Sequence, residues 1–164
     1  AFCENVSEMI FPGTTSAMES SILSGCYSIT KVVLPPKIKE IKKYDFYNCK
    51  NLKKLTIPKS VKTVSMSAFA GSGLKKIVLP ENVTTIKNGD AGRKVFKYIK
   101  GINYPTKNLR VIEIHSKKVK SIQKNSFSGL SSKVVIKVPK SKKKKYTKML
   151  RKSGLSKKVK ICNL

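Results

Sequence analysis

The single histidine of the chain, His115, follows Glu113 by two residues. Residues two apart on a strand share one face, so this imidazole and this carboxylate are expected on the same side of the chain. No serine or cysteine stands at a recognisable catalytic spacing from them, and the acidic residues are scattered. Residues 89–94 also lack the spacing of a phosphate-binding loop. The sequence therefore predicts that the protein is not an enzyme, with no catalytic residue, no metal site and no cofactor.

The four cysteines are arranged for packing more than for chemistry. Cys26 and Cys49 are separated by one interval of the repeat described below, so they are expected one above the other as free, buried thiols. A disulfide between them stays open as an alternative if neighbouring coils stack closely. Cys3 and Cys162 belong to opposite ends of the chain and are not expected to meet. Cys3 could instead pack beneath Cys26.

Cations and aromatic rings are interleaved between residues 88 and 107. The residues concerned are Arg93, Lys94, Phe96, Lys97, Tyr98, Lys100 and Tyr104. Such a composition can stack on sugars or bases while it pairs with anions. The alternative is a structural role, in which Phe96 and Tyr98 fill a space left by Ala91, where the repeat would place phenylalanine. We select Arg93, Lys97, Tyr98 and Tyr104 as candidate ligand-binding residues.

These residues must be positioned by a repeat. An apolar residue followed by proline occurs at nearly constant intervals, at Phe11-Pro12, Leu34-Pro35, Ile57-Pro58 and Leu79-Pro80. Further apolar columns keep the same register, including Leu23, Phe46 and Phe69, each of which follows one of the first three prolines at the same distance. A fixed period in the range of about 20 to 50 residues is typical of stacked structural repeats.

Each column has a physical interpretation. In residues 52–57, Leu55 and Ile57 alternate with Lys54 and Thr56, which predicts a strand with one buried face. Proline lacks a backbone donor and suits the turn that follows. Residues 61–64 are expected to form a second strand or extended segment. Phe69 is expected to place its ring between neighbouring coils, because one coil cannot bury its apolar side alone.

The columns resemble those of a known family. Residues Pro35, Ile38, Ile41, Asp45, Phe46, Asn48, Cys49 and Leu52, and again Pro58, Val61, Val64, Ala68, Phe69, Gly71 and Leu74, follow a pattern similar to the BspA-type leucine-rich repeats of bacterial surface proteins. The resemblance covers roughly residues 1–139 and implies a secreted or cell-surface protein. Because solenoids of this kind serve many ligands, it implies little about a particular partner.

The end of the chain differs from the repeat. Residues 141–153 predict a short helix, with Ser141 as its N-cap, Gly154 as its stop, and Tyr146, Met149 and Leu150 on one stripe. A closing strand around Val159 and Ile161 follows. We therefore expect an α/β solenoid, mostly β, a right-handed stack of about five to six coils, with a C-terminal helix-strand cap. Residues 1–139 would form the solenoid, interrupted by an insertion at residues 88–107, and residues 140–164 the cap, all in one continuous domain.

The ends of the chain bear on where the protein is found. Residues 1–3 resemble the second half of a coil, which suggests the C-terminal fragment of a longer protein. No signal peptide is visible in the chain, and no apolar run approaches the about 20 residues needed to span a bilayer. We expect an extracellular or cell-surface location and a monomer.

The charge is strongly positive. The net charge is +28, residues 1–30 contain no Lys or Arg, and residues 114–164 contain no Asp or Glu. Such a field attracts polyanions, although lysines also keep a protein soluble without any partner. The only arginines are Arg93, Arg110 and Arg151. Base recognition favours arginine forks, so we expect no sequence-specific nucleic-acid binding.

Three lysines stand in one column. Lys31, Lys54 and Lys76 each precede a proline by four residues, so they are expected on the exposed face of successive strands, about 4.8 Å apart. Stacked like charges repel, so the side chains should either spread into water or hold an anion. We expect a non-catalytic binding or adhesion module that recognises a protein or an anionic polymer or glycan. The alternatives are a spacer without a ligand and an ancillary domain of an enzyme that lies upstream.

Overall fold

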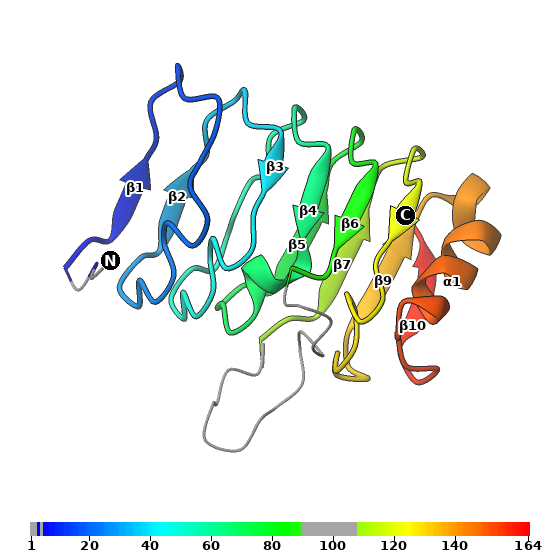
Figure 1. Ribbon diagram of the computed structural model, residues 1–164. Coiled ribbons are helices and arrows are strands. Elements are labelled where there is room, and N and C mark those ends of the chain that lie inside the picture. The colour runs from blue at the N-terminus through cyan, green and yellow to red at the C-terminus, as the bar shows by residue number, and fades with distance from the viewer. Residues whose placement is uncertain (1–2, 4, 90–107) are drawn as a thin grey trace.

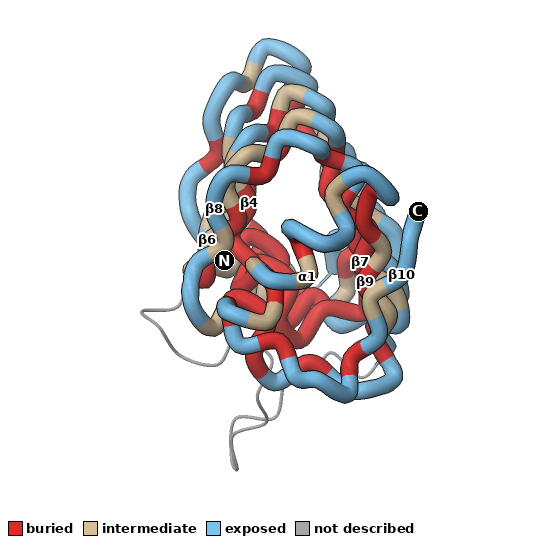
Figure 2. The backbone as a smooth tube through the Cα atoms, turned by 90° about the vertical axis from the view of Figure 1, so that its right-hand side faces the viewer, coloured by how far each residue is buried: buried red, intermediate tan, exposed pale blue. Residues whose placement is uncertain are grey.

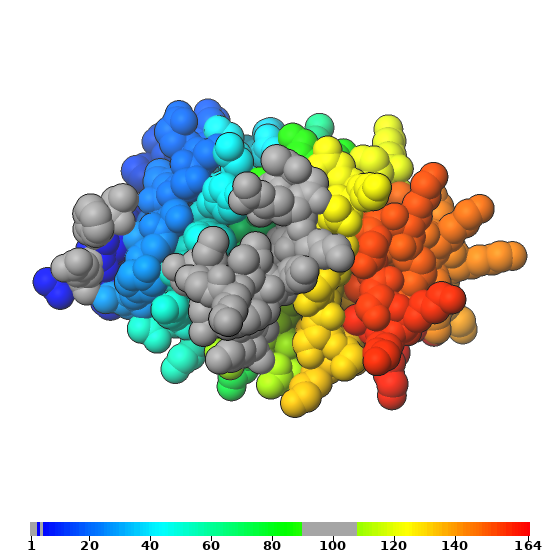
Figure 3. Space-filling view, turned by 60° about the horizontal axis from the view of Figure 1, so that its bottom comes forward, coloured from blue at the N-terminus to red at the C-terminus, as the bar shows by residue number. Residues whose placement is uncertain are grey.

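The computed structural model describes residue 3, residues 5–89 and residues 108–164. Its coils are stacked side by side, from the N-terminal coil to the C-terminal helix (Figure 1). In a space-filling view the coils follow one another as successive bands from one end of the protein to the other (Figure 3). Most strands lie over the equivalent strand of the preceding coil, as the repeat predicts.

The strands form two sets. The first set contains β1 (Glu8–Ile10), β2 (Lys31–Val33), β5 (Lys76–Leu79), β7 (Val111–Ile114), β9 (Val135–Val138) and β10 (Lys160–Asn163). The second contains β3 (Glu40–Ile41), β4 (Thr63–Ser65), β6 (Thr85–Lys87) and β8 (Ser121–Ile122). All pairs are parallel. The chain therefore alternates between two walls of a flattened coil.

The register confirms the predicted columns. Met9 lies opposite Val32 across β1 and β2, and Val64 lies opposite Ile86 across β4 and β6. Across the predicted insertion, Leu79 lies opposite Ile114, so the coil regains its register after the longer interval. Side chains alternate in direction along a strand, so both apolar residues of each of these pairs face inward.

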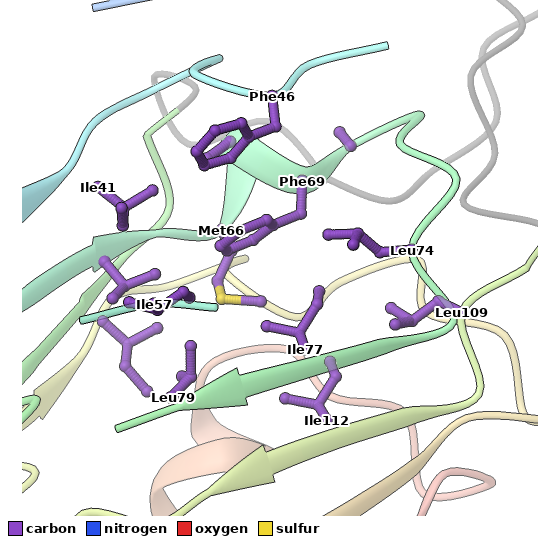
Figure 4. Packing of buried hydrophobic residues seen from close by; sticks show 14 of the residues in the cluster. Ile41, Phe46, Ile57, Met66, Phe69, Leu74, Ile77, Leu79, Leu109 and Ile112 are labelled. Atoms are coloured by element: carbon purple, nitrogen blue, oxygen red, sulfur yellow. The ribbon is translucent and has the colours of Figure 1, made fainter. Parts of the chain in front are cut away.

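The core runs along the whole stack. Buried positions line the inside of the coils and exposed positions the outside (Figure 2). The 3-10 helix η1 (Met66–Phe69) is fully buried and carries Phe69 beneath Phe46 (Figure 4). Asn48 and Gly71 occupy one column with φ of 60° and 73°. Glycine and asparagine tolerate this left-handed conformation better than most residues, so both types suit this column.

One predicted strand is absent. Residues 53–57 keep the expected alternation, because Lys54 and Thr56 are exposed, Leu55 is half-buried and Ile57 is buried. They nevertheless form no ladder. Within the described residues, the first set of strands is divided into a two-stranded sheet, β1-β2, and a four-stranded sheet, β10-β9-β7-β5. The prediction of a strand over residues 52–57 was therefore right about side-chain direction and wrong about backbone pairing.

The C-terminal cap has the predicted helix with a different start. The 3-10 turn η2 (Lys140–Lys142) leads into α1 (Lys143–Lys152), so Ser141 lies within the turn and is not the N-cap. The helix ends where expected, since Gly154 has a φ of 91° and donates its N–H to the carbonyl of Arg151. The Tyr146 hydroxyl accepts from Val119 N–H and donates to the Ser116 carbonyl, both at 3.0 Å, which fixes the helix to the last coils.

Candidate binding face

The outward side of the first set of strands is the surface on which the lysine column was predicted. We call it the strand face. Its residues, in chain order, are Glu8 and Ile10, Lys31 and Val33, Lys54 and Thr56, Lys76 and Val78, Val111 and Glu113, Val135 and Lys137, and Lys160 and Cys162. Side chains on this face alternate with the buried ones because the strands are extended.

The lysine column is partly neutralised. Lys31 Nζ lies 3.0 Å from a carboxylate oxygen of Glu8, and Lys76 Nζ lies 3.0 Å from one of Glu113. Neither ion pair was predicted from the sequence. Glu8 precedes Lys31 by one repeat interval, so the repeat itself could have shown that pair. No carboxylate of a described residue lies within ion-pairing distance of Lys54. Among the described residues, the column therefore has one cation without a neutralising carboxylate, at its centre.

Glu113 is the centre of a cluster of cations. Besides Lys76, it contacts Lys137 at 3.5 Å and accepts a hydrogen bond from His115 at 3.0 Å. Burial opposes the ionisation of Glu113, but the hydrogen bonds from His115 and Lys76 and the charges of Lys76 and Lys137 outweigh it and lower its pKa to about 2. His115 and Glu113 thus lie on the same face, as predicted, and their contact is part of an ion-pair network that joins three coils.

The strand face is open at its third coil. Thr30 and Lys31 both donate to the Ser7 carbonyl, and Arg110 and Val111 both donate to the Lys75 carbonyl. The equivalent bonds on either side of residues 53–57 are missing. Although every residue of this region is described, no backbone hydrogen bond joins residues 53–57 to β2 or to β5. Backbone pairing is therefore absent on both sides of residues 53–57, and we call these two unpaired positions of the wall the open rungs. On the other wall, β3, β4 and β6 stay paired.

A groove of about 430 Å³ lies at this opening. One side is lined by Lys31, Val32, Val33 and Leu34, and the other by Lys54, Leu55, Thr56 and Pro58. Val33 is 41% exposed, a high fraction for an aliphatic residue in a strand. The side chains that line the groove are largely apolar, with a lysine on each side. No pattern in the sequence predicted this groove, because it depends on a backbone ladder that fails to form.

The candidate residues of the insertion lie outside the described residues. These are Arg93, Lys97, Tyr98 and Tyr104. The chain leads into this segment from β6, where Asn88 N–H donates to Gln123 Oε1 at 2.9 Å and the Asn88 carbonyl accepts from Ser67 N–H at 3.1 Å. Asn88 therefore ties the root of the insertion to the coils before and after it.

The cysteines differ from the prediction in one respect. Cys3 and Cys26 form a disulfide, with their Cα atoms 4.8 Å apart, so the expectation of a free thiol at Cys26 was wrong. Stacking of equivalent positions brings these two residues together. Cys49 is a free, buried thiol, as predicted, and donates to the Leu23 carbonyl at 3.0 Å. Burial raises the pKa of Cys49 to about 12.

A buried carboxylate is a further feature that the sequence did not predict. Asp45 is fully buried and accepts hydrogen bonds from the backbone N–H groups of Lys42, at 2.7 Å, and Ser21, at 3.2 Å. Burial raises the pKa of Asp45 to about 7, against the lowering effect of these bonds and of the Lys42 charge. It is enclosed within the coil and joins two turns, so its role is structural.

Metal ligation and membrane insertion find no support in the part of the chain that the structure describes. No group of three or more His, Cys, Asp or Glu residues there could hold a metal ion. None of the helices in that part has the length and apolar character to cross a membrane. The strand face combines charge, exposed apolar groups and open backbone.

Two walls of parallel strands, stacked at a nearly constant interval that only the insertion interrupts, define a leucine-rich repeat solenoid. The particular family follows from the sequence match. Residues 1–103 and 97–163 match the model of the BspA type leucine rich repeat region with six copies. The chain belongs to this family, as the resemblance of its columns predicted.

Solved structures agree on the fold. The chain is similar to the pneumococcal vaccine antigen PcpA, with a TM-score of 0.65 and 21% identity over 98% of this chain and 42% of that one. It is also similar to a leucine-rich repeat protein from Bacteroides ovatus ATCC 8483, with a TM-score of 0.54 and 16% identity over 98% of this chain and 52% of that one. The chain thus spans about half or less of each protein. No curated protein sequence matches the chain.

Proposed function

We propose that the chain is a non-catalytic binding or adhesion module of a secreted or cell-surface bacterial protein, and that it recognises an anionic partner through the strand face. The partner would be an acidic protein or an anionic polymer or glycan. The observation that carries this proposal is Lys54. It is exposed at the centre of the lysine column, and no carboxylate of a described residue neutralises it, whereas Lys31 and Lys76 are each paired.

The charge of the whole chain supports the same proposal. A net charge of +28 would raise the rate at which anions arrive and would not select among them. Selection requires a defined surface. The strand face offers one, because Lys31 and Lys76 are held in β2 and β5 with Lys54 between them in the column, and the exposed aliphatic residues Ile10 and Val33 lie on the same face. The insertion, residues 88–107, would add further contacts through Arg93, Lys97, Tyr98 and Tyr104.

The family and the structural neighbours bear on location. BspA-type repeats match along the whole chain, and one neighbour is named as a vaccine antigen of the pneumococcus. The family match and this neighbour together favour an extracellular or cell-surface location for this chain. A spacer without a ligand remains the competing function, because a lysine-rich surface also keeps a solenoid soluble.

Binding to immobilised heparin at low ionic strength tests this proposal. The triple variant Lys31→Gln, Lys54→Gln, Lys76→Gln should weaken binding by about tenfold, since each rigidly held cation contributes to the contact. The matched control is Lys143→Gln, Lys144→Gln, Lys145→Gln, which removes the same charge from exposed positions of α1. An equal loss in both variants would mean diffuse attraction, and no binding by the wild type would favour the spacer. Replacing residues 90–107 by a short Gly-Ser linker tests the insertion separately.

A further inference from the structure

The unpaired backbone beside residues 53–57 indicates which kind of anionic partner the strand face would bind. We propose that the groove between β2 and this segment binds an extended, acidic peptide segment of a partner protein, which adds to the open edge of β2 as a strand. This inference rests on the proposed function, because it names the kind of anionic partner that the strand face would take. Three properties of the groove support it, namely its open backbone, its apolar lining and its lysines.

The open backbone comes first. Lys31 N–H and the Val33 carbonyl are used toward β1, since they bond to Ser7 and Phe11. Alternate residues of a strand present their backbone groups to opposite neighbours, so Val32 presents its N–H and carbonyl to the groove. β2 pairs only with β1 among the described strands. An open edge of this kind is a template for an added strand.

The lining gives the second property. Val33 is exposed on the outward side of the groove and Leu55 is half-buried on its inward side, so the groove presents aliphatic surface to both faces of an added strand. The volume of about 430 Å³ is within the range of small binding sites. An added strand places alternate side chains on one face. Its inward side chains should therefore be apolar.

The lysines give the third property. Lys31 begins β2, and Lys54 occupies the same column in the next coil, so both ammonium groups belong to the same end of the groove. Pro36 and Pro58 line the groove beyond the other ends of the two segments. Prolines have no N–H to donate, so strand addition is limited to the stretch between the lysines and the prolines. Carboxylates on the partner would pair with Lys54 and, in competition with Glu8, with Lys31.

A labelled peptide of alternating Glu and Val, about eight residues long, is the probe, since this is an ordinary strand length. Its affinity is measured by fluorescence polarisation at physiological ionic strength, where diffuse attraction is screened. We expect saturable binding that is lost when Glu is replaced by Gln, or Val by Gly. Val33→Trp should fill the groove and weaken binding at least about tenfold. Ile10→Trp is the matched control, because Ile10 lies opposite Val33 in the neighbouring coil and does not line the groove.

Amide hydrogen exchange distinguishes strand addition from surface attraction. In the free protein Val32 and Thr56 should exchange quickly, and the peptide should slow both by at least about tenfold. Circular dichroism verifies that each variant is folded, and Lys54→Gln, which is exposed, provides a second test that does not alter the groove's shape. Its affinity for the peptide should fall several-fold, with Lys145→Gln unchanged.

The outcomes separate this inference from the proposed function. If the peptide fails to bind, or binds equally to Val33→Trp, while heparin binding still depends on the lysine column, the inference is wrong and the proposed function stands. If an anionic lipid vesicle slows amide exchange at Val32 and Thr56 and the peptide does not, the groove binds a membrane surface and the inference of a peptide ligand is wrong. If neither heparin nor the peptide binds the wild type, both proposals fail.

Discussion

The rings of Phe46 and Phe69, which stand one repeat apart in the chain, stack with their centroids 6.1 Å apart and their planes at 18°. Both side chains are fully buried, and each comes from the turn that follows the second strand of its coil. Coils of a solenoid are stabilised mainly by their neighbours. This pair therefore contributes to the contact between the second and third coils, on the wall opposite the open rungs.

Truncation of this pair should destabilise the stack strongly. Phe69→Ala should lower the free energy of unfolding by about 3–5 kcal/mol, because it removes a large buried ring and leaves a cavity. Urea unfolding followed by circular dichroism measures the change. Ile10→Ala is the control, since Ile10 is 65% exposed and its loss should change the free energy by less than about 0.5 kcal/mol. A similar effect for both variants would contradict the stacking role.

The sequence could predict this contact because the repeat carries it. Side chains such as Phe46 and Phe69 recur at a constant interval, and a constant interval in a stack means vertical contact. The same reasoning extends to Cys3 and Cys26 and to Glu8 and Lys31, since each pair is also separated by one repeat. The packing of Cys3 beneath Cys26 was predicted, but their disulfide was not, because a thiol and a disulfide look alike in sequence. The pair of Glu8 with Lys31 was not predicted, because the lysine column is visible in the sequence without its acidic neighbours.

Contacts that depart from the repeat could not be predicted. Glu113 meets Lys76 only because the register resumes after the insertion, so the sequence interval between them has no counterpart in other coils. Asp45 stands in the column where the next coil has Ala68, and nothing in the pattern shows that its carboxylate bonds to two turns. The open rungs beside residues 53–57 concern backbone bonds, whereas alternation of Lys54, Leu55 and Thr56 reports only side-chain direction.

Because two coils approach closely at Gly73, a side chain at this position should destabilise the protein. A Cβ atom at this position would lie 2.9 Å from the carbonyl carbon of Lys50, and the N–H of Gly73 donates to the Cys49 carbonyl at 3.0 Å. Gly73→Ala should therefore lower the free energy of unfolding by about 1–3 kcal/mol, because backbone must move to make room. Gly13→Ala is the matched control, since no atom lies within 4 Å of the added Cβ and stability should be nearly unchanged.

The cysteines should differ sharply in reactivity. Under native, non-reducing conditions a thiol-alkylating reagent should label only Cys162, which is exposed, because Cys49 is buried and its raised pKa keeps it protonated. Unfolding without a reductant should make Cys49 a second labelled site. Unfolding with a reductant should also allow labelling of Cys3 and Cys26. Peptide mass spectrometry identifies each labelled site. Labelling of Cys26 in the native, unreduced protein would contradict the disulfide.

The ion pairs of Glu113 should stabilise the protein above mildly acidic pH. The folded pKa of Glu113 is lowered from 4.5 to about 2, so its contribution is fully present above pH 4.5 and is lost as the pH falls toward 2. The shift corresponds to about 3 kcal/mol. Glu113→Gln should lower the free energy of unfolding by a similar amount at pH 7 and remove this pH dependence. Glu81→Gln, which breaks an exposed pair with Lys59, should cost less than about 1 kcal/mol.

Asp45 should have the opposite pH dependence. Its folded pKa is raised from 3.8 to about 7, so the folded state holds a proton that the unfolded state releases. The resulting stabilisation is fully present below pH 3.8 and is lost as the pH rises through 7. It amounts to at most about 4 kcal/mol. Asp45→Asn, which stays neutral, should abolish the decline between these values. The exposed substitution Glu19→Gln should leave it intact.

The carboxyl carbon of Asp45 offers a direct measurement. Its chemical shift should titrate near pH 7 in the folded protein, because burial disfavours the charged form more than the two backbone N–H groups favour it. A titration near pH 4 would show that the hydrogen bonds from Lys42 and Ser21 prevail instead. In that case the stability of the wild type would not fall between pH 4 and 7, and the unfolding measurements would agree with the titration in rejecting the prediction.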